Sequence, residues 1–129
     1  MLRIFVLIIS ILFLSCNAKI NQTKQGKEHG KWIVKSDNDL WKGRYRDGAE
    51  IGTWKSFTNG RLYKKERFRK NASYIVFYYS NGKIKSCGKA NMISNEQEIH
   101  WFYNGKWNYY NENGELIETK VYDKGVLME

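Results

Sequence analysis

The stretch Gly52-Thr53-Trp54-Lys55-Ser56-Phe57-Thr58-Asn59-Gly60-Arg61-Leu62 decides the fold of this chain. It places an Asn-Gly pair between an aromatic segment and a segment that begins with Arg61 and the apolar Leu62. Asn-Gly is a strong hairpin signal, because both central positions of a type I′ turn require a positive φ. The stretch therefore predicts two antiparallel strands that meet at Asn59-Gly60.

The same unit recurs along the chain at intervals of about 23 residues. Such a period indicates that each copy is one small β element, which needs its neighbours to bury its apolar face. Four imperfect copies are present, with an insertion within residues 93–104 before the last one. The repeat positions are the aromatic residues Trp32, Trp54, Phe77 and Trp107, and the turns Asn59-Gly60, Asn81-Gly82 and Asn113-Gly114.

Side-chain alternation after the first turn predicts which residues share a sheet face. Residues of one strand alternate between the two faces. Leu62, Lys64, Glu66 and Phe68 are expected on one face, and Arg61, Tyr63, Lys65 and Arg67 on the other. Asn71 stands where the previous copy has Gly48, so it is expected in the left-handed region that Asn tolerates. No helical periodicity follows residue 16, so we predict an all-β fold.

The unit resembles the bacterial variant of the MORN repeat, whose pattern is Gly-x-Trp-x-x-Tyr, then Asn-Gly-Lys-Leu, then Tyr-x-x-Gly. The resemblance spans residues 30–125, with Asn38-Asp39 in place of one Asn-Gly. It implies an elongated, twisted meander of antiparallel β-hairpin repeats. Bacterial members are often labelled antitoxin or immunity proteins, and relatives elsewhere are scaffolds or lipid-proximal modules.

The N-terminus carries an export signal. Arg3 precedes an apolar run over residues 4–14, which is too short to span a bilayer and is typical of a signal peptide. The segment Leu12-Phe13-Leu14-Ser15-Cys16 resembles a bacterial lipoprotein signal, although Phe13 stands where the common pattern has Leu. The resemblance implies a signal peptide over residues 1–15 and lipid attachment at Cys16. An ordinary secretory signal or an uncleaved helix is the alternative.

Domain boundaries and location follow from this signal. Residues 16–29 are mostly polar and are predicted to be a tether, and residues 30–129 form the MORN-like repeat domain. Asn17 follows the cysteine where lipoproteins of the inner membrane often carry Asp. By resemblance, we expect an exported protein anchored to the outer membrane and facing the periplasm. After cleavage and lipidation Cys87 is the one free thiol, so no intrachain disulfide is possible.

Charge suggests the kind of partner. The chain carries a net charge of +9, with basic residues concentrated before residue 90. A basic field attracts acidic partners and accelerates their encounter at low salt. We predict that Arg61, Tyr63, Lys65 and Arg67 form a face for an anionic partner, either a protein or an anionic envelope component. The alternative is a solubilising surface. Nucleic acid is disfavoured as a partner, because an exported protein meets little of it.

Catalytic and metal-ligating patterns are weak. His29 and His100 are the two histidines, and neither lies near a nucleophile in the sequence. Glu96 and Glu98 precede His100 in the insertion, where a solvated loop or an edge strand is the simpler interpretation. No pair of cysteines or histidines has the spacing of a zinc site, and no calcium loop is present. The sequence therefore predicts a protein that is not an enzyme and has no cofactor.

Two functions are compatible with these features. The first is a lipid-anchored envelope binding module that uses a basic, aromatic sheet face. The second is an immunity or antitoxin protein that neutralises a cognate toxin. The sequence leaves the oligomeric state open.

Overall fold

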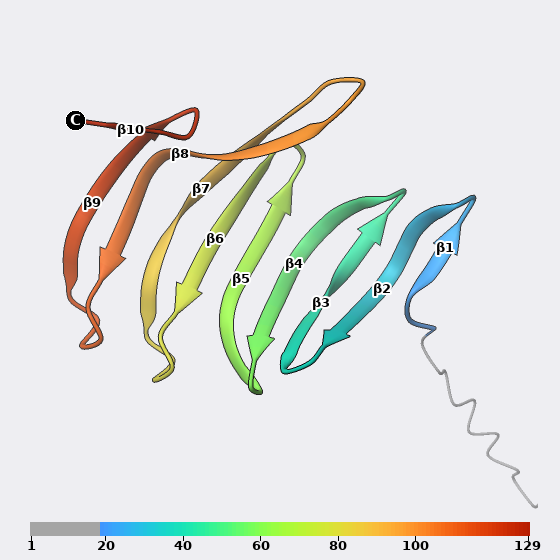
Figure 1. The fold of residues 1–129 in the computed structure, drawn as a ribbon, viewed down its shortest axis with the longest axis horizontal. Helices are drawn as coiled ribbons and strands as arrows, with labels where there is room; N and C mark the ends of the chain where they lie inside the picture. Colours follow the sequence, from blue (N-terminus) through green and yellow to red (C-terminus); the bar gives the residue numbers. More distant parts are fainter. Residues whose placement is uncertain (1–18) are drawn as a thin grey trace, which may run out of the picture.

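The structure, a computed structural model, describes residues 19–129. The predicted signal peptide at residues 1–15 and the predicted lipid-attachment residue Cys16 lie outside the described residues. Ten antiparallel strands form one sheet in which each strand pairs with the next along the chain (Figure 1). The strands are β1 Gln22–Lys24, β2 Lys27–Ser36, β3 Asp39–Arg46, β4 Ala49–Thr58, β5 Arg61–Arg69, β6 Ala72–Tyr78, β7 Ile84–Ser94, β8 Ile99–Tyr110, β9 Leu116–Asp123 and β10 Val126–Met128.

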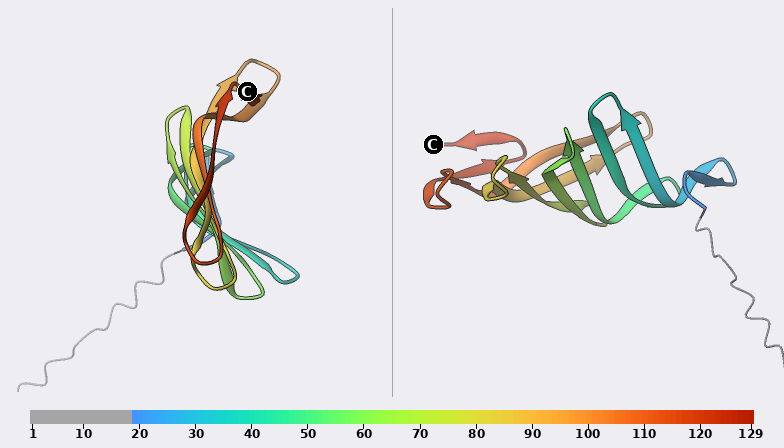
Figure 2. Two further views of the ribbon diagram at one scale, coloured as in Figure 1. Left: turned by 90° about the vertical axis from the view of Figure 1, so that its left-hand side faces the viewer. Right: turned by 90° about the horizontal axis from the view of Figure 1, so that it is seen from below.

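The predicted all-β hairpin meander is confirmed. Seen edge-on, the sheet is a single curved and twisted layer (Figure 2). The described residues contain no second layer to cover either face, so burial has to come from side chains that pack along the sheet. Within residues 19–129, no helix is long and apolar enough to cross a membrane.

The sheet begins at Gln22, inside the range predicted as a tether. Thr23 pairs with Glu28 across a turn in which Gln25 and Gly26 have φ of 52° and 74°. Exposed polar residues are compatible with a short edge strand, so low apolar content alone did not reveal it. The side-chain amide of Asn21 also bonds both main-chain groups of Ile33 on the outer edge of β2, accepting from the N–H at 2.7 Å and donating to the carbonyl at 2.9 Å.

The three Asn-Gly turns have two geometries. Asn59 and Gly60 both have positive φ, 48° and 74°, as a type I′ turn requires. In the other two turns only the glycine does, with φ of 85° at Gly82 and 90° at Gly114. The hydrogen bonds around Gly82 enclose a three-residue loop, which is a type I turn followed by a left-handed glycine.

The turn between β5 and β6 differs from the prediction. Its left-handed residue is Lys70, with φ of 49°, rather than Asn71. The prediction rested on aligning Asn71 with Gly48. However, a two-residue turn also requires a positive φ at its first central position, which Lys70 occupies.

The insertion within residues 93–104 lengthens the hairpin of β7 and β8. Pairing extends to Ser94 and Ile99, and the side chain of Asn95 accepts from two backbone N–H groups in the connecting turn. The insertion therefore continues the sheet upward in Figure 1 without adding a new layer.

The Gly-x-Trp motif forms a β-bulge in the copies that begin at Gly52 and Gly105. Gly52 has φ of 65° and Gly105 has φ of 77°, and each lies at a register shift where its strand carries two more residues than its partner. The bulge sends Trp107 across the neighbouring strand, where it is 1% exposed. There the indole covers Gly88 so closely that a Cβ on that glycine would lie 2.3 Å from the ring. Trp54 covers Gly43 in the same way, at 2.1 Å.

These tryptophans belong to one aromatic face of the sheet. Its buried centre is Ile75, Ala90 and Trp107, with further aromatic residues packed around them. Burial is the main cause that raises the pKa of Tyr45 and of Tyr103 above the usual value. The aromatic pairs of this face are Trp32–Tyr45, Tyr45–Trp54, Phe68–Trp101, Phe77–Trp107, Tyr103–Trp107 and Tyr103–Tyr122.

Phe77 shares this face but does not occupy the row of Trp54. Trp54 pairs with Glu66, Glu66 pairs with Ile75, and Ile75 reaches Trp107 through Gly88. The bulge in β4 adds two residues before Trp54, and β6 has no such bulge. The residue of β6 that lies in the row of Trp54 is therefore Ile75, two positions before Phe77. Counting residues along the chain therefore predicts correctly the face on which Phe77 lies, but it predicts the wrong cross-strand row.

Strict alternation along β5 is also interrupted. Phe57 pairs with Leu62 and Ser56 pairs with Lys64, so Tyr63 is an extra residue in a bulge. Leu62 and Tyr63 consequently line the same hollow. Leu62 is therefore not on the face of Lys64, Glu66 and Phe68, as simple alternation predicted.

Candidate anionic-ligand face

The face opposite the aromatic residues carries a row of lysines. Lys42 on β3, Lys55 on β4 and Lys65 on β5 are direct cross-strand partners. Directly opposed residues in a sheet have Cβ atoms about 5 Å apart, so the three side chains are neighbours. Lys42 also lies over the ring of Phe57, with its Nζ 4.8 Å from the ring centroid. We call this row, including the residues that continue it on the neighbouring strands, the basic row.

A second row runs parallel to the basic row. Thr53 pairs with Arg67, Arg67 with Tyr74, and Tyr74 with Lys89. Arg67 and Tyr74 are exposed. The two rows together form a surface that carries cations, aromatic side chains and apolar side chains.

Neither row contains an acidic residue. The basic row continues through Val76, Cys87, Asn108 and Thr119, all of which are uncharged. Within residues 19–129 the ion pairs are His29–Asp47, Lys64–Glu66 and Lys120–Glu118, and none involves a member of either row. The positive charge of this face is therefore not neutralised by neighbours in the described part of the chain.

A cleft opens beside the basic row between β5 and β6. Pairing of these strands ends at Lys64 and Phe77, so their ends near the lower turns in Figure 1 separate. By contrast, β3 and β4 stay paired as far as Asp39 and Thr58. The resulting hollow has a volume of about 510 Å³ and is lined by Thr58, Asn59, Arg61, Leu62, Tyr63, Tyr78, Tyr79 and Ser80.

Two lysines overlook tyrosines at this cleft. The Nζ of Lys65 lies 5.6 Å from the ring centroid of Tyr78, and the Nζ of Lys85 lies 5.8 Å from that of Tyr79. The hydroxyl of Tyr79 donates to the carbonyl of Tyr110 at 2.8 Å, which fixes this ring against the β8 end. Cations above tyrosine rings, beside phenolic donors, form a suitable environment for an anion that also has apolar parts.

The structure brings most of the predicted site residues together. Arg61 and Tyr63 line the cleft, and Lys65 lies at its upper end. Arg67 lies farther along the same strand in the second row, exposed and opposite Thr53 and Tyr74. The four residues share one strand, and three of them are at the cleft. Simple alternation predicted that they also share one face, but they do not: Leu62 pairs with Phe57 and Arg61 with Thr58, so the extra residue Tyr63 places Arg61 on the other face from Lys65 and Arg67.

Sequence reasoning missed the lysines contributed by other strands. Lys42 and Lys55 belong to the basic row, and Lys85 belongs to the cleft. Their positions depend on the register across bulged strands, which residue counting does not give. Tyr78 precedes the Asn81-Gly82 turn, and this was the one available signal that an aromatic residue would lie near it.

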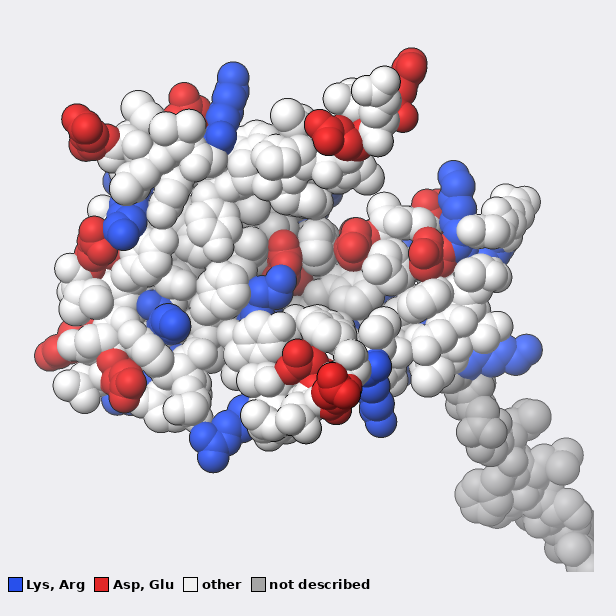
Figure 3. All heavy atoms as spheres, in the orientation of Figure 1, with Lys and Arg blue, Asp and Glu red and all other residues white. Residues whose placement is uncertain are grey.

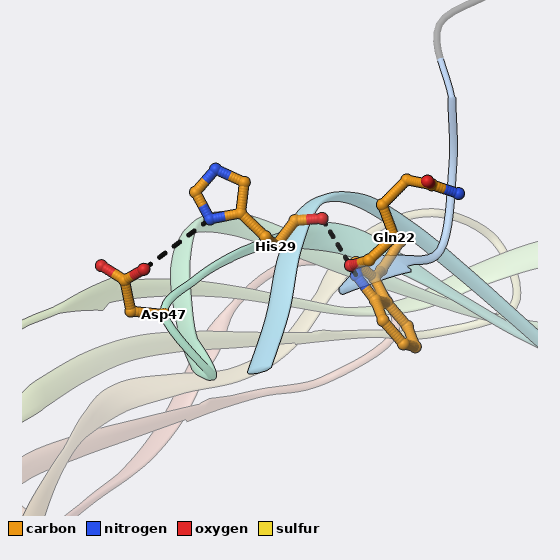
Figure 4. A network of polar contacts seen from close by, with 4 residues as sticks. Gln22, His29 and Asp47 are labelled. Atoms are coloured by element: carbon orange, nitrogen blue, oxygen red, sulfur yellow. Dashed lines mark hydrogen bonds and ion pairs between the residues drawn. The ribbon is translucent and has the colours of Figure 1, made fainter. Parts of the chain in front are cut away.

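The histidine candidates are separate from this face. Figure 4 shows the His29 ring directed toward the Asp47 carboxylate, with its Nδ1 3.9 Å from Oδ1, which is too long for a hydrogen bond. The carbonyls of His29 and Gln22 both accept from the indole N–H of Trp32. His100 is exposed and stacks on Phe102, and Glu96 and Glu98 lie in the exposed turn beside it.

Figure 3 shows a side of the molecule on which the charges are distributed differently from those of the basic row. Uncharged surface covers much of the middle of the sheet, and blue and red groups are mixed around the margin. The surface is hollowed beside the blue and red groups near its middle. Neither sign of charge dominates this view.

Comparisons with family models, with curated proteins and with solved structures found no match for this chain. Among residues 19–129, no group of three or more histidine, cysteine or acidic side chains is arranged to hold a metal ion. Cys87, the one free thiol expected after lipidation, is half-buried on β7. The geometry of the basic face is therefore the basis for a functional proposal.

Proposed function

We propose that the protein is a non-enzymatic binding module of the cell envelope, held by a lipid on Cys16, whose basic sheet face engages an anionic surface. The lipoprotein-like segment ending at Cys16 supports the anchoring, and Asn17 after the cysteine supports location at the outer membrane, facing the periplasm. Resemblance to MORN-variant repeats supports a role in interaction. The partner favoured by the face is a phosphate-bearing lipid surface.

The observation that carries this proposal is the uncompensated basic row. Like charges placed directly opposite each other destabilise a sheet. Here Lys55 has a lysine opposite it on both sides, and no acidic residue lies in the row. A feature that destabilises a fold and has no compensating structural role is expected at a functional site.

The test measures capture of anionic vesicles by the full lipidated chain, reconstituted in neutral phosphatidylcholine nanodiscs on a sensor. Phosphatidylglycerol vesicles should bind, and phosphatidylcholine vesicles should not. Each basic residue near an anionic membrane contributes about 1 kcal/mol, so reversing Lys42, Lys55 and Lys65 to glutamate should weaken capture by more than about tenfold. The effect should shrink at high salt, where exposed charges are screened.

A matched variant separates location from net charge. Reversing Lys27, Lys70 and Lys124, which lie at turns, changes the net charge equally but leaves the basic row intact. This variant should retain most of the capture. If both variants lose vesicle capture equally, capture depends on the net charge of the protein and not on the basic row, which would contradict the proposal.

The cleft favours one further candidate. Arg61, Lys65 and Lys85 surround it, and no acidic residue lines it, so it could receive an acidic loop of a partner protein. Neutralisation of a cognate toxin by this route is the second proposal. It predicts that Arg61→Glu abolishes protection of cells against that toxin while capture of phosphatidylglycerol vesicles persists.

A further inference from the structure

The aromatic face is interrupted at one repeat position. Gly43 and Gly88 each lie beneath a tryptophan of the following strand. The corresponding position on β5 is Glu66, and the following strand places Ile75 opposite it. One copy of the repeat thus has a carboxylate where the others have a glycine, and an aliphatic side chain where the others have an indole.

This interruption creates a groove of about 280 Å³. Trp41, Tyr45 and Trp54 lie on one side of it and Phe68 on the other. The complete lining is Val34, Trp41, Tyr45, Glu50, Trp54, Ser56, Lys64, Glu66 and Phe68. Concave sites with mainly aromatic walls and a few converging polar groups are typical of small-molecule binding.

Polar groups of both signs lie in the groove. The Nζ of Lys64 donates to Oε2 of Glu66 at 2.9 Å, and the hydroxyl of Ser73 donates to Oε1 at 2.7 Å. The two charged side chains are only 28% and 13% exposed. Removing such a pair from water is costly, and an apolar pair of similar size often gives a more stable fold. Both retain unused hydrogen-bonding capacity, because an ammonium has three donors and a carboxylate about four acceptor sites.

We infer that this groove binds an uncharged saccharide. The C–H faces of a pyranose ring stack on aromatic walls, and its hydroxyls both donate and accept hydrogen bonds. A simple cation would be repelled by Lys64, and a simple anion by Glu50 and Glu66. A neutral polyol pairs with all three. The groove lies on the opposite face from the basic row, so this inference is independent of the proposed function.

The test observes the tryptophan indole N–H resonances of the full isotope-labelled chain in detergent micelles. The probes are uncharged tetrasaccharides of β-linked glucose, of β-linked N-acetylglucosamine and of mannose. At least one should shift the resonances of Trp41 and Trp54 while those of Trp32 and Trp107 stay in place. Absence of a selective shift with all three overturns the inference, as does an equal shift produced by choline chloride or inorganic phosphate.

Two variants and a control locate the binding. Trp41→Ala removes one wall, and Glu50→Gln changes an exposed rim residue while keeping its size. Each should weaken the affinity by about tenfold, the equivalent of one charged hydrogen bond or one stacking contact. Tyr74→Ala on the opposite face should leave the affinity unchanged. Unaltered affinity in Glu50→Gln together with loss in Tyr74→Ala would place the sugar elsewhere and refute the assignment.

Discussion

Gly88 and Trp107 show how single residues stabilise a sheet that has no second layer. The indole lies flat on the glycine, and its N–H donates to the carbonyl of Lys89 at 2.9 Å. The ring of Tyr103 stacks on the indole with centroids 3.8 Å apart. A side chain that covers the backbone of its own sheet thus replaces the contacts that a packed helix or second sheet would supply.

Gly88→Ala should destabilise the fold by about 1–3 kcal/mol, because the added methyl group overlaps a buried ring that is held from both sides. Urea unfolding followed by tryptophan fluorescence measures the change. Cys87→Ala is the matched control, since its side chain lies on the opposite face. Equal stability of Gly88→Ala and Cys87→Ala would show that Trp107 can move aside, contrary to this account.

Tyr109 should make the fold sensitive to alkali. Burial and its hydrogen bond with the hydroxyl of Tyr122, 3.3 Å away, raise the pKa of Tyr109 well above the usual value. The folded state therefore retains a proton that the unfolded chain releases near pH 10. Stability from this group is complete below about pH 10 and is lost as the pH rises above that value.

Thermal unfolding between pH 8 and pH 11 tests this expectation. The melting temperature should fall above about pH 10, and Tyr109→Phe should flatten that fall. Tyr74→Phe, at an exposed position on the other face, serves as the control and should keep the wild-type slope. Identical slopes in all three proteins would exclude Tyr109 as the cause.

At the scale of elements, the adjacent lysines of the basic row lower the stability of the sheet while they serve the proposed binding. Lys55 lies between Lys42 and Lys65 on adjacent strands. Lys55→Thr should raise the free energy of unfolding by about 0.2–1 kcal/mol, because it removes two like-charge neighbours and adds a β-branched residue. The gain should decrease in high salt.

Lys106→Thr is the control for this change, since Lys106 has Val121 opposite it on β9 and should give the smaller gain. Urea unfolding at low and high salt compares the two variants. A loss of stability in Lys55→Thr would mean that the row is a packing feature of the sheet and would weaken the functional argument.

Strands and turns were predictable because their signals are local. The Asn59-Gly60 turn and the aromatic residues before it define a hairpin without reference to the rest of the chain. Cross-strand rows were not predictable, since they depend on extra residues at Tyr63, Gly52 and Gly105, and a bulge moves every later residue to a new partner. The sequence consequently singled out basic residues of β5, but their neighbours on β3, β4 and β7 were missed.

At the scale of the whole molecule, Cys16 should determine where the sheet is located. Cys16→Ala should abolish incorporation of radiolabelled palmitate and release the protein from the membrane fraction. Cys87→Ala retains the proposed anchoring residue and should incorporate the label normally. Persistent labelling of the Cys16→Ala protein would end the proposal of a lipid anchor.

The side-chain amide of Asn21 has a consequence for how copies of this protein can meet. A sheet with two exposed edge strands can polymerise without limit, because each edge offers main-chain hydrogen-bond donors and acceptors to the next molecule. Asn21 already occupies both main-chain groups of Ile33, so a second molecule cannot pair with the sheet at that position. A molecule that joins this edge must pair with β1 or with the far end of β2, on either side of the blocked position.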